Sequence, residues 1–142
     1  MSRSLLMAGW VAIESDLSGR FEVYVRPYPN LEGGQWPIST EGGIQPLWSP
    51  SGQELFYVGL DGALMRVDVD IGTTVHAGTP QRVLPPGYYV GSPSARFEGR
   101  QYDIAQDGRR FLMIKLDAAA PTPTMIVVQH FASVFVERQS NR

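Results

Sequence analysis

The chain has 142 residues, of which 43% are hydrophobic and 18% charged, and its formal net charge is −2. This length is typical of one domain with a real core. The near-neutral charge argues against a nucleic-acid partner, because phosphates require concentrated positive charge. The chain contains no cysteine, which excludes disulfides and thiolate chemistry.

Short segments rich in Val, Ile, Tyr, Phe and Trp, each bounded by turn residues, predict an all-β chain with almost no helix. We expect strands, in chain order, over 9–13, 21–26, 35–39, 45–49, 54–58, 63–69, 80–84, 100–105, 110–114 and 124–130. The 15 glycines and 11 prolines agree with many tight turns. For the tail from Phe131 to Arg142 we expect a closing strand, with a short terminal helix as the alternative.

Three turns carry specific conformational demands. The Ser-Pro-Ser-Gly sequence at 49–52 predicts a type I turn, since proline suits its second position and glycine its fourth. Asp107 and Gly108 stand at the equivalent place in a later copy of the same phrase, so we expect the same turn there. Asp61 and Gly62 predict a two-residue hairpin with positive φ at both residues.

One turn-and-strand phrase recurs along the chain. The clearest copy begins at Pro46, a second begins at Tyr102, and a partial copy begins at Gly9. Strand positions 55–57 align with positions 111–113, at an offset of 56 residues, and with positions 10–12, at an offset of 45 residues. Spaced copies of one antiparallel unit predict a repeat architecture.

Several predicted strands are apolar at consecutive positions and do not alternate with polar residues. They lie at 55–58, 111–114 and 125–128. A strand that is buried on both faces has this pattern. Small sheets stacked face to face, as in propeller blades, bury their inner strands in this way.

The chain resembles the TolB-like, WD-type β-propeller repeats of bacterial proteins, and most closely the C-terminal propellers of some bacterial serine/threonine kinases. The phrases that carry the resemblance lie at 18–29, 34–40, 46–57, 61–65 and 102–113. These motifs are turns and packing positions, so they bear on fold more than on function. The resemblance implies four-stranded antiparallel blades in a single domain, 1–142, with blades at about 6–40, 44–84 and 98–138. Ser51 departs from the aspartate usual in that family's turn.

The number of blades bears on assembly. Complete members of the family have six or more blades, whereas this chain has about three. An open wedge of three would expose the apolar outer faces of its terminal blades to water. We therefore expect two copies to close a six-bladed ring as a homodimer; the alternative is that the chain is a cloned or natural fragment.

The segment between the second and third predicted blades, residues 85–99, is where we expect recognition, because loops on rigid scaffolds concentrate binding residues. This segment and its flank contain Tyr88, Tyr89, Arg96 and Arg100, a mixture enriched at binding hot spots. We take these four as candidate residues for binding a protein or small-molecule ligand. The alternative is that the two tyrosines seal the channel mouth or the seam between chains.

No constellation of residues predicts catalysis or metal binding. His76 and His130 are the two histidines, and neither has partners at the spacing of a metal site or a catalytic triad. Asp68 and Asp70 share a strand face, but the glycine and glutamate of a calcium loop are absent. We predict a non-catalytic recognition module with no cofactor. A hydrolase or lactonase with a channel-mouth site, and a structural remnant without ligand, are the alternatives.

The N-terminal segment and the hydropathy bear on location. Gly9 interrupts the first apolar run and no small-x-small cleavage site follows it, so we expect a strand there and not a secretory signal. No run approaches the ~18 apolar residues of a membrane span. We therefore expect a soluble chain without a membrane partner, cytoplasmic in preference to periplasmic.

Overall fold

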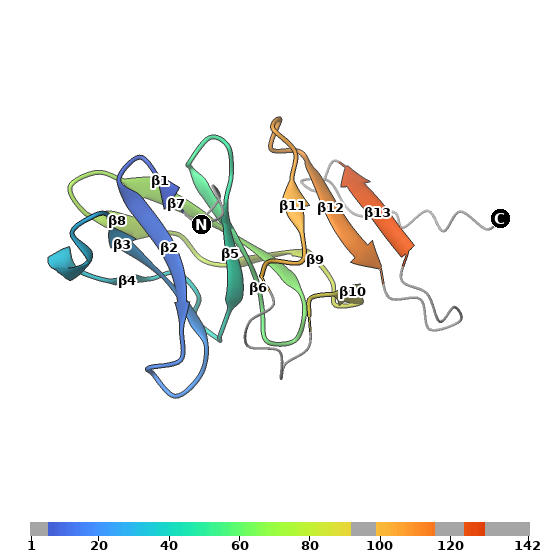
Figure 1. Ribbon diagram of the computed structural model, residues 1–142, viewed down its shortest axis with the longest axis horizontal. Coiled ribbons are helices and arrows are strands. Elements are labelled where there is room, and N and C mark those ends of the chain that lie inside the picture. Colours follow the sequence, from blue (N-terminus) through green and yellow to red (C-terminus); the bar gives the residue numbers. More distant parts are fainter. Residues whose placement is uncertain (1–5, 92–98, 116–123, 130–142) are drawn as a thin grey trace.

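The computed structural model describes residues 6–91, 99–115 and 124–129, with residues 6 and 124–129 described by their backbone. The described chain is all-β and consists of antiparallel sheets, with one 3-10 turn, η2 (Leu31–Gly33). Three sheets follow one another in chain order, and the second lies between the first and the third (Figure 1). No helix among these residues has the length and apolarity needed to cross a membrane.

The first sheet contains four strands in the order of the chain. They are β1 (Leu6–Met7), β2 (Trp10–Ser15), β3 (Glu22–Pro27) and β4 (Trp36–Pro37). Successive residues of a strand point to opposite faces. Ala12, Val23 and Val25 are fully buried on the face toward the second sheet, so Val11 and Tyr24 lie on the face turned away from it.

The second sheet is built on a central strand that is buried on both faces. Its strands are β5 (Ile44–Trp48), β6 (Glu54–Val58), β7 (Leu64–Ile71), β8 (Val75–Ala77) and β9 (Gln81–Leu84). On β6, Leu55 and Tyr57 face the first sheet, while Phe56 and Val58 face the third. The prediction that this strand is buried on both faces is therefore confirmed. At 111–114 it is wrong within the chain, because Leu112 is 42% exposed on the face turned away from the second sheet, and the side chains of 125–128 lie outside the described residues.

The third sheet has one edge strand made of two pieces. Its strands are β10 (Tyr88–Tyr89), β11 (Asp103–Ile104), β12 (Arg110–Lys115) and β13 (Thr124–Gln129). β13 pairs along the whole of β12, and β10 and β11 pair with different parts of β12. Because each β12 residue has two neighbours, β10 and β11 must share the edge opposite β13.

Several strand predictions require correction. The segment 85–99 is predicted to lack strands, but Tyr88 and Tyr89 pair with β12, whose edge extends beyond the reach of β11. The strand expected at 100–105 is shortened to β11, and the strand expected at 35–39 is shortened to β4. The sequence does not predict β8, which forms because β7 is long enough to pair with two successive segments.

Two apolar cores fill the spaces between neighbouring sheets. Between the first and second sheets lie Ala12, Val23, Val25, Ile38, Trp48, Leu55, Tyr57, Val67, Val69 and Val75. Between the second and third lie Leu47, Phe56, Val58, Leu64, Val83, Leu84, Tyr102, Phe111 and Met113. In the second core the rings of Phe56 and Phe111 meet edge to face, with centroids 4.9 Å apart and an interplanar angle of 78°, a favoured aromatic geometry.

The cores also correct the repeat alignment. Ala12 and Phe56 both face the following sheet, and β2 and β6 begin 44 residues apart, at Trp10 and Glu54, so the spacing is 44 and not 45. A slip of one residue exchanges the two faces of a strand. The 56-residue spacing holds, because Leu55 and Phe111 both face the preceding sheet.

The predicted turns are confirmed at two of three places. The Gly52 N–H donates to the Ser49 carbonyl over 3.0 Å, and the Gly108 N–H donates to the Ala105 carbonyl over 2.9 Å. Both glycines have positive φ, +73° and +68°. The third prediction, a two-residue loop at Asp61 and Gly62 with positive φ at both residues, is wrong.

The hairpin between β6 and β7 uses a longer loop than expected. The Gly62 N–H donates to the Gly59 carbonyl over 2.9 Å, and Gly62 alone has positive φ (+90°) in this turn. The Asp61 carboxylate instead accepts from the Ala63 N–H over 3.0 Å. An aspartate side chain that bonds to the backbone two residues on stabilises a turn without requiring positive φ at the aspartate.

Candidate functional site

Three of the four predicted recognition residues lie within the described chain. Tyr88 and Tyr89 are half-buried on β10, opposite Lys115 and Ile114 of β12. Tyr88 packs against the second core, and burial raises the pKa of its hydroxyl. Arg96 lies outside the described residues.

Arg100 is held by its neighbours along the chain. Its Nε donates to the Tyr102 carbonyl over 2.7 Å, and its Nη2 lies 3.3 Å from Oδ1 of Asp103. Its side chain is 16% exposed. The guanidinium is therefore set in a fixed position beside the start of β11, and its predicted role in binding stays a prediction.

The side chain of Gln45 connects the two flanks of the predicted recognition segment. Its Nε2 donates to the Val90 carbonyl over 2.6 Å, and its Oε1 accepts from the Gln101 N–H over 3.0 Å. Val90 follows Tyr89, and Gln101 follows Arg100. One amide group therefore brings both flanks, with their candidate binding residues, to the same place; we call this arrangement the Gln45 clamp.

The backbone of Gln45 is also fully engaged. Its N–H donates to Oε2 of Glu14 over 2.5 Å, and its carbonyl accepts from the Tyr102 hydroxyl over 2.7 Å. Glu14 belongs to the first sheet, Gln45 to the second, and Tyr102 directly precedes β11 of the third. This residue thus forms hydrogen bonds with segments of all three sheets.

Gln45 has an unusual backbone conformation. Its φ is +54°, and it lies in an irregularity of the ladder between Ile44 and Leu47. A left-handed residue other than glycine costs on the order of 1–3 kcal/mol and persists where its surroundings fix it. Here four hydrogen bonds fix it. Such strain is concentrated at functional sites, which makes this place a candidate.

The hydroxyl of Tyr102 is a dependable donor in this arrangement. Burial, the largest influence, raises its pKa far above the usual range of tyrosine, although Arg100 opposes the shift. The phenol therefore stays protonated at any physiological pH, and it can donate to the Gln45 carbonyl throughout. Asp103 and Glu14 act in the same direction as burial.

Gln45 is a site residue that the sequence does not predict. Its partners lie 31 to 57 positions away along the chain, at Glu14, Val90, Gln101 and Tyr102. The sequence holds one weak signal, a long polar residue directly before Pro46 at the start of an apolar strand.

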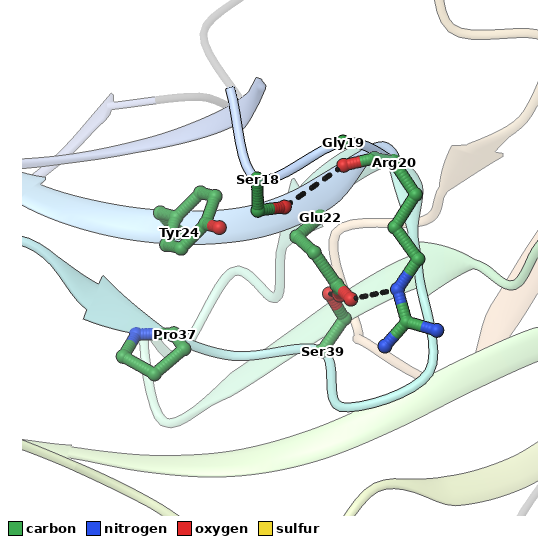
Figure 2. A pocket seen from close by; sticks show the side chains of 7 residues that line it. All are labelled: Ser18, Gly19, Arg20, Glu22, Tyr24, Pro37 and Ser39. Carbon is green, nitrogen blue, oxygen red and sulfur yellow. Dashed lines mark hydrogen bonds and ion pairs between the residues drawn. The ribbon is translucent and has the colours of Figure 1, made fainter. Parts of the chain in front are cut away.

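A hollow of about 550 Å³ lies beside β3 of the first sheet (Figure 2). Its lining residues are Ser18, Gly19, Arg20, Glu22, Tyr24, Pro37 and Ser39. Val23 and Val25 face the second sheet, and Tyr24, which lies between them on β3, points to the opposite face. The hollow therefore opens on the side of the sheet turned away from the second sheet. Figure 2 shows the Glu22 carboxylate between Arg20 and Ser39.

The Glu22 carboxylate is surrounded by hydrogen-bond donors. Arg20 Nε lies 2.6 Å away, the Ser39 hydroxyl donates to Oε2, and the Gly42 N–H lies 3.0 Å from both oxygens. Burial by itself raises the pKa of Glu22, but the bonds from Ser39, Arg20 and Gly42 outweigh it and leave the pKa below 4.5. A carboxylate held ionised in this way ties β3 to the segment after β4, and it is poorly suited to general acid chemistry.

We expect Glu22→Gln to reduce stability at neutral pH by about 1–3 kcal/mol, because a buried charge-assisted network loses its acceptor. A lowered pKa contributes stability above pH 4.5 that is lost as the pH falls through the folded-state pKa. The difference between wild type and variant should therefore shrink below about pH 4.5. Urea unfolding from about pH 7 to about pH 3 measures it, with the exposed Glu32→Gln as control. A difference that is independent of pH would contradict the network.

A second hollow, of about 510 Å³, lies at the outer edge of the second sheet and is lined in part by Asp68, Asp70 and His76. Asp70 pairs with His76 across β7 and β8, and the His76 ring lies 3.2 Å from the Thr74 hydroxyl. Within the described ranges, no three His, Cys, Asp or Glu residues are close enough to hold a metal ion. His130 lies outside those ranges.

No protein-family model matches the chain, and no curated protein sequence matches it. The propeller resemblance therefore rests on the turn-and-strand phrases of the sequence alone. A function is inferred from the geometry of the three sheets and of the Gln45 clamp.

Proposed function

We propose that the chain is a non-catalytic recognition module of the β-propeller type, with its three sheets as successive blades. The proposal is supported by three antiparallel sheets that pack face to face in chain order around two apolar cores. It is also supported by the double burial of β6, which stacked blades require. Three blades are half of a six-bladed ring, and a second copy completes it.

The proposed recognition surface consists of Tyr88, Tyr89 and Arg100 together with the clamped flanks at Val90 and Gln101. The Gln45 clamp carries this proposal. A strained residue uses its whole side chain to hold two flanks that lie 11 residues apart in sequence, Val90 and Gln101. Holding these two flanks in one arrangement before the ligand arrives reduces the ordering cost of binding.

The ligand class that fits this surface is a peptide segment of another protein. Tyr88 and Tyr89 lie on opposite faces of β10, so it is Tyr89, together with the fixed Arg100, that offers a ligand apolar area with polar edges, a composition enriched at protein interfaces. Tyr88 packs into the second core, so Tyr89 and Arg100 are the residues whose truncation tests recognition most directly.

The test is selection of phage-displayed random peptides on the wild-type chain. We expect enriched peptides whose affinity for Tyr89→Ala is at least about tenfold weaker, the effect of losing one interface aromatic. Tyr28→Ala, at a 41% exposed tyrosine of the first sheet's outer loop, is the matched control and should bind normally. Peptides that bind both variants equally, or no enrichment at all, would contradict the proposal. Sustained turnover of chromogenic esters or lactones would favour the hydrolase alternative.

A further inference from the structure

Two sheet faces carry apolar residues and point away from the second sheet. On β12, Phe111 and Met113 enter the second core, so Leu112 and Ile114 lie on the opposite face, where Leu112 is 42% exposed. On β2, Ala12 enters the first core, so Val11 lies on the outer face and is half-buried. The first and third sheets lie on opposite sides of the second, so neither covers the other (Figure 1).

The two cores show which sheet faces meet when one sheet packs on the next. In the first core, Ala12 of the first sheet and Leu55 of the second are both fully buried. In the second core, Phe56 of the second sheet contacts Phe111 of the third. In both cores, a middle-strand residue that faces the following sheet shares the core with a middle-strand residue of that sheet that faces back.

The middle-strand residues form two sets, one facing the following sheet and one facing the preceding sheet, and the repeat spacing adds one residue to each set. Ala12 and Phe56 face the following sheet, and the residue 56 positions after Phe56 is Leu112. Phe111 and Leu55 face the preceding sheet, and the residue 44 positions before Leu55 is Val11. Among the described residues, therefore, no sheet follows the forward-facing Leu112 and none precedes the backward-facing Val11.

We propose that a second copy of the chain occupies both faces, with Leu112 of one copy packed against Val11 of the partner subunit. The third sheet of each copy then lies on the first sheet of the other, and the same seam forms twice. A contact between two different surfaces closes into a dimer when the rotation is two-fold. This inference rests on the blade architecture proposed for the three sheets.

Charged residues beside the two positions are complementary. Asp103 pairs with Leu112 on the third sheet, and its side chain is 62% exposed although Arg100 lies 3.3 Å away. Arg26 pairs with Val11 on the first sheet, where it donates to Gln35. Asp103 beside Leu112 and Arg26 beside Val11 therefore offer one pair of opposite charges across the seam, while Arg110, on the same face as Leu112, already has Asp107 as its partner.

Two substitutions test the seam from its two sides. Leu112→Lys places a cation beside Asp103, and Val11→Glu places an anion beside Arg26, so each new charge has an opposite charge across its own ladder and the sheet is retained. We expect wild type to sediment at twice the mass of the chain. Each variant should dissociate, with a dimer affinity weaker by at least about 100-fold, because each substitution affects both seams.

Mixing the two variants is the decisive arm. A mixed dimer contains one wild-type seam and one seam in which the introduced lysine of one copy faces the introduced glutamate of the other, so dimers should return on mixing. Leu17→Lys, at a turn leucine that is 88% exposed, is the control and should remain dimeric. Near-ultraviolet circular dichroism of each variant shows that the cores are intact. Leu112→Ser and Val11→Thr are milder probes, and each should weaken the dimer less than the charged substitution at the same position.

Each other result overturns the inference. A wild-type monomer at every concentration would exclude a second copy, and a dimer sensitive to Leu112→Lys alone would indicate a seam between two third sheets. Loss in both variants without return on mixing would also exclude the proposed pairing. Tyr89 pairs with Ile114 and therefore lies on the same sheet face as Leu112, on its edge strand, so recognition is scored separately on each species: a monomer that binds the selected peptides refutes the seam only, and a dimer that binds none refutes the recognition proposal only.

Discussion

Phe111→Ala is expected to lower the free energy of unfolding by about 3–5 kcal/mol, the usual cost of removing a buried aromatic ring. Phe111 and its contact Phe56 are both fully buried in the core between the second and third sheets. The cavity would lie at the centre of that core, where neither sheet can close it without losing its own pairing. For a chain of this length the midpoint of thermal unfolding should fall by roughly 10 °C or more.

Thermal and urea unfolding followed by tryptophan fluorescence measure this effect. Leu17→Ala is the matched control, because Leu17 is 88% exposed in the turn between β2 and β3; its change should stay within about 0.5 kcal/mol. A small effect of Phe111→Ala would mean that the third sheet does not pack on the second as described. A loss confined to the third sheet would appear as a second, separate transition.

Gln45→Ala is expected to destabilise the chain by about 2–3 kcal/mol, because the Val90 carbonyl and the Gln101 N–H both lose their partner. The backbone bonds to Glu14 and Tyr102 can survive the change. Amide exchange at Gln101 should accelerate at least tenfold, since the clamp is its acceptor. This local readout separates loss of the clamp from a general loss of stability.

Gln45→Gly divides the effect into its two components. Glycine adopts positive φ without strain, so this variant should be about 1 kcal/mol more stable than Gln45→Ala while losing the same side-chain bonds. Exchange at Gln101 should accelerate equally in both. If Gln45→Ala leaves both stability and Gln101 exchange unchanged, the clamp does not hold the flanks together.

Local features of the fold were predictable from the sequence. The turns that end at Gly52 and Gly108 each depend on a few adjacent residues, and the structure confirms both. The double burial of 55–58 follows from an unbroken apolar run and is also confirmed. Such features require only neighbouring residues, whose conformational preferences the chain itself sets.

Features that depend on distant partners were not predictable. The strand at Tyr88 exists because β12 offers an edge there, and the sequence of the segment itself gives no reason to expect it. The one-residue error in the aligned spacing of 45 between the first two sheets shows only in which sheet each residue faces, and that depends on packing between distant segments. The Gln45 clamp requires three segments to converge, so neither its strain nor its hydrogen bonds follow from one stretch of sequence.

Because the edge of the third sheet is divided, the segment between β10 and β11 can change in length without changing how either strand pairs with β12. β10 and β11 lie in line on β12, and the chain leaves that edge after Tyr89 and returns to it at Asp103. Residues added or removed between the two pieces leave every partner of β12 in register, and doubling the excursion costs only about 0.6 kcal/mol in closure entropy. The third sheet therefore has a built-in position where sequence can diverge or be exchanged while the scaffold around it is preserved.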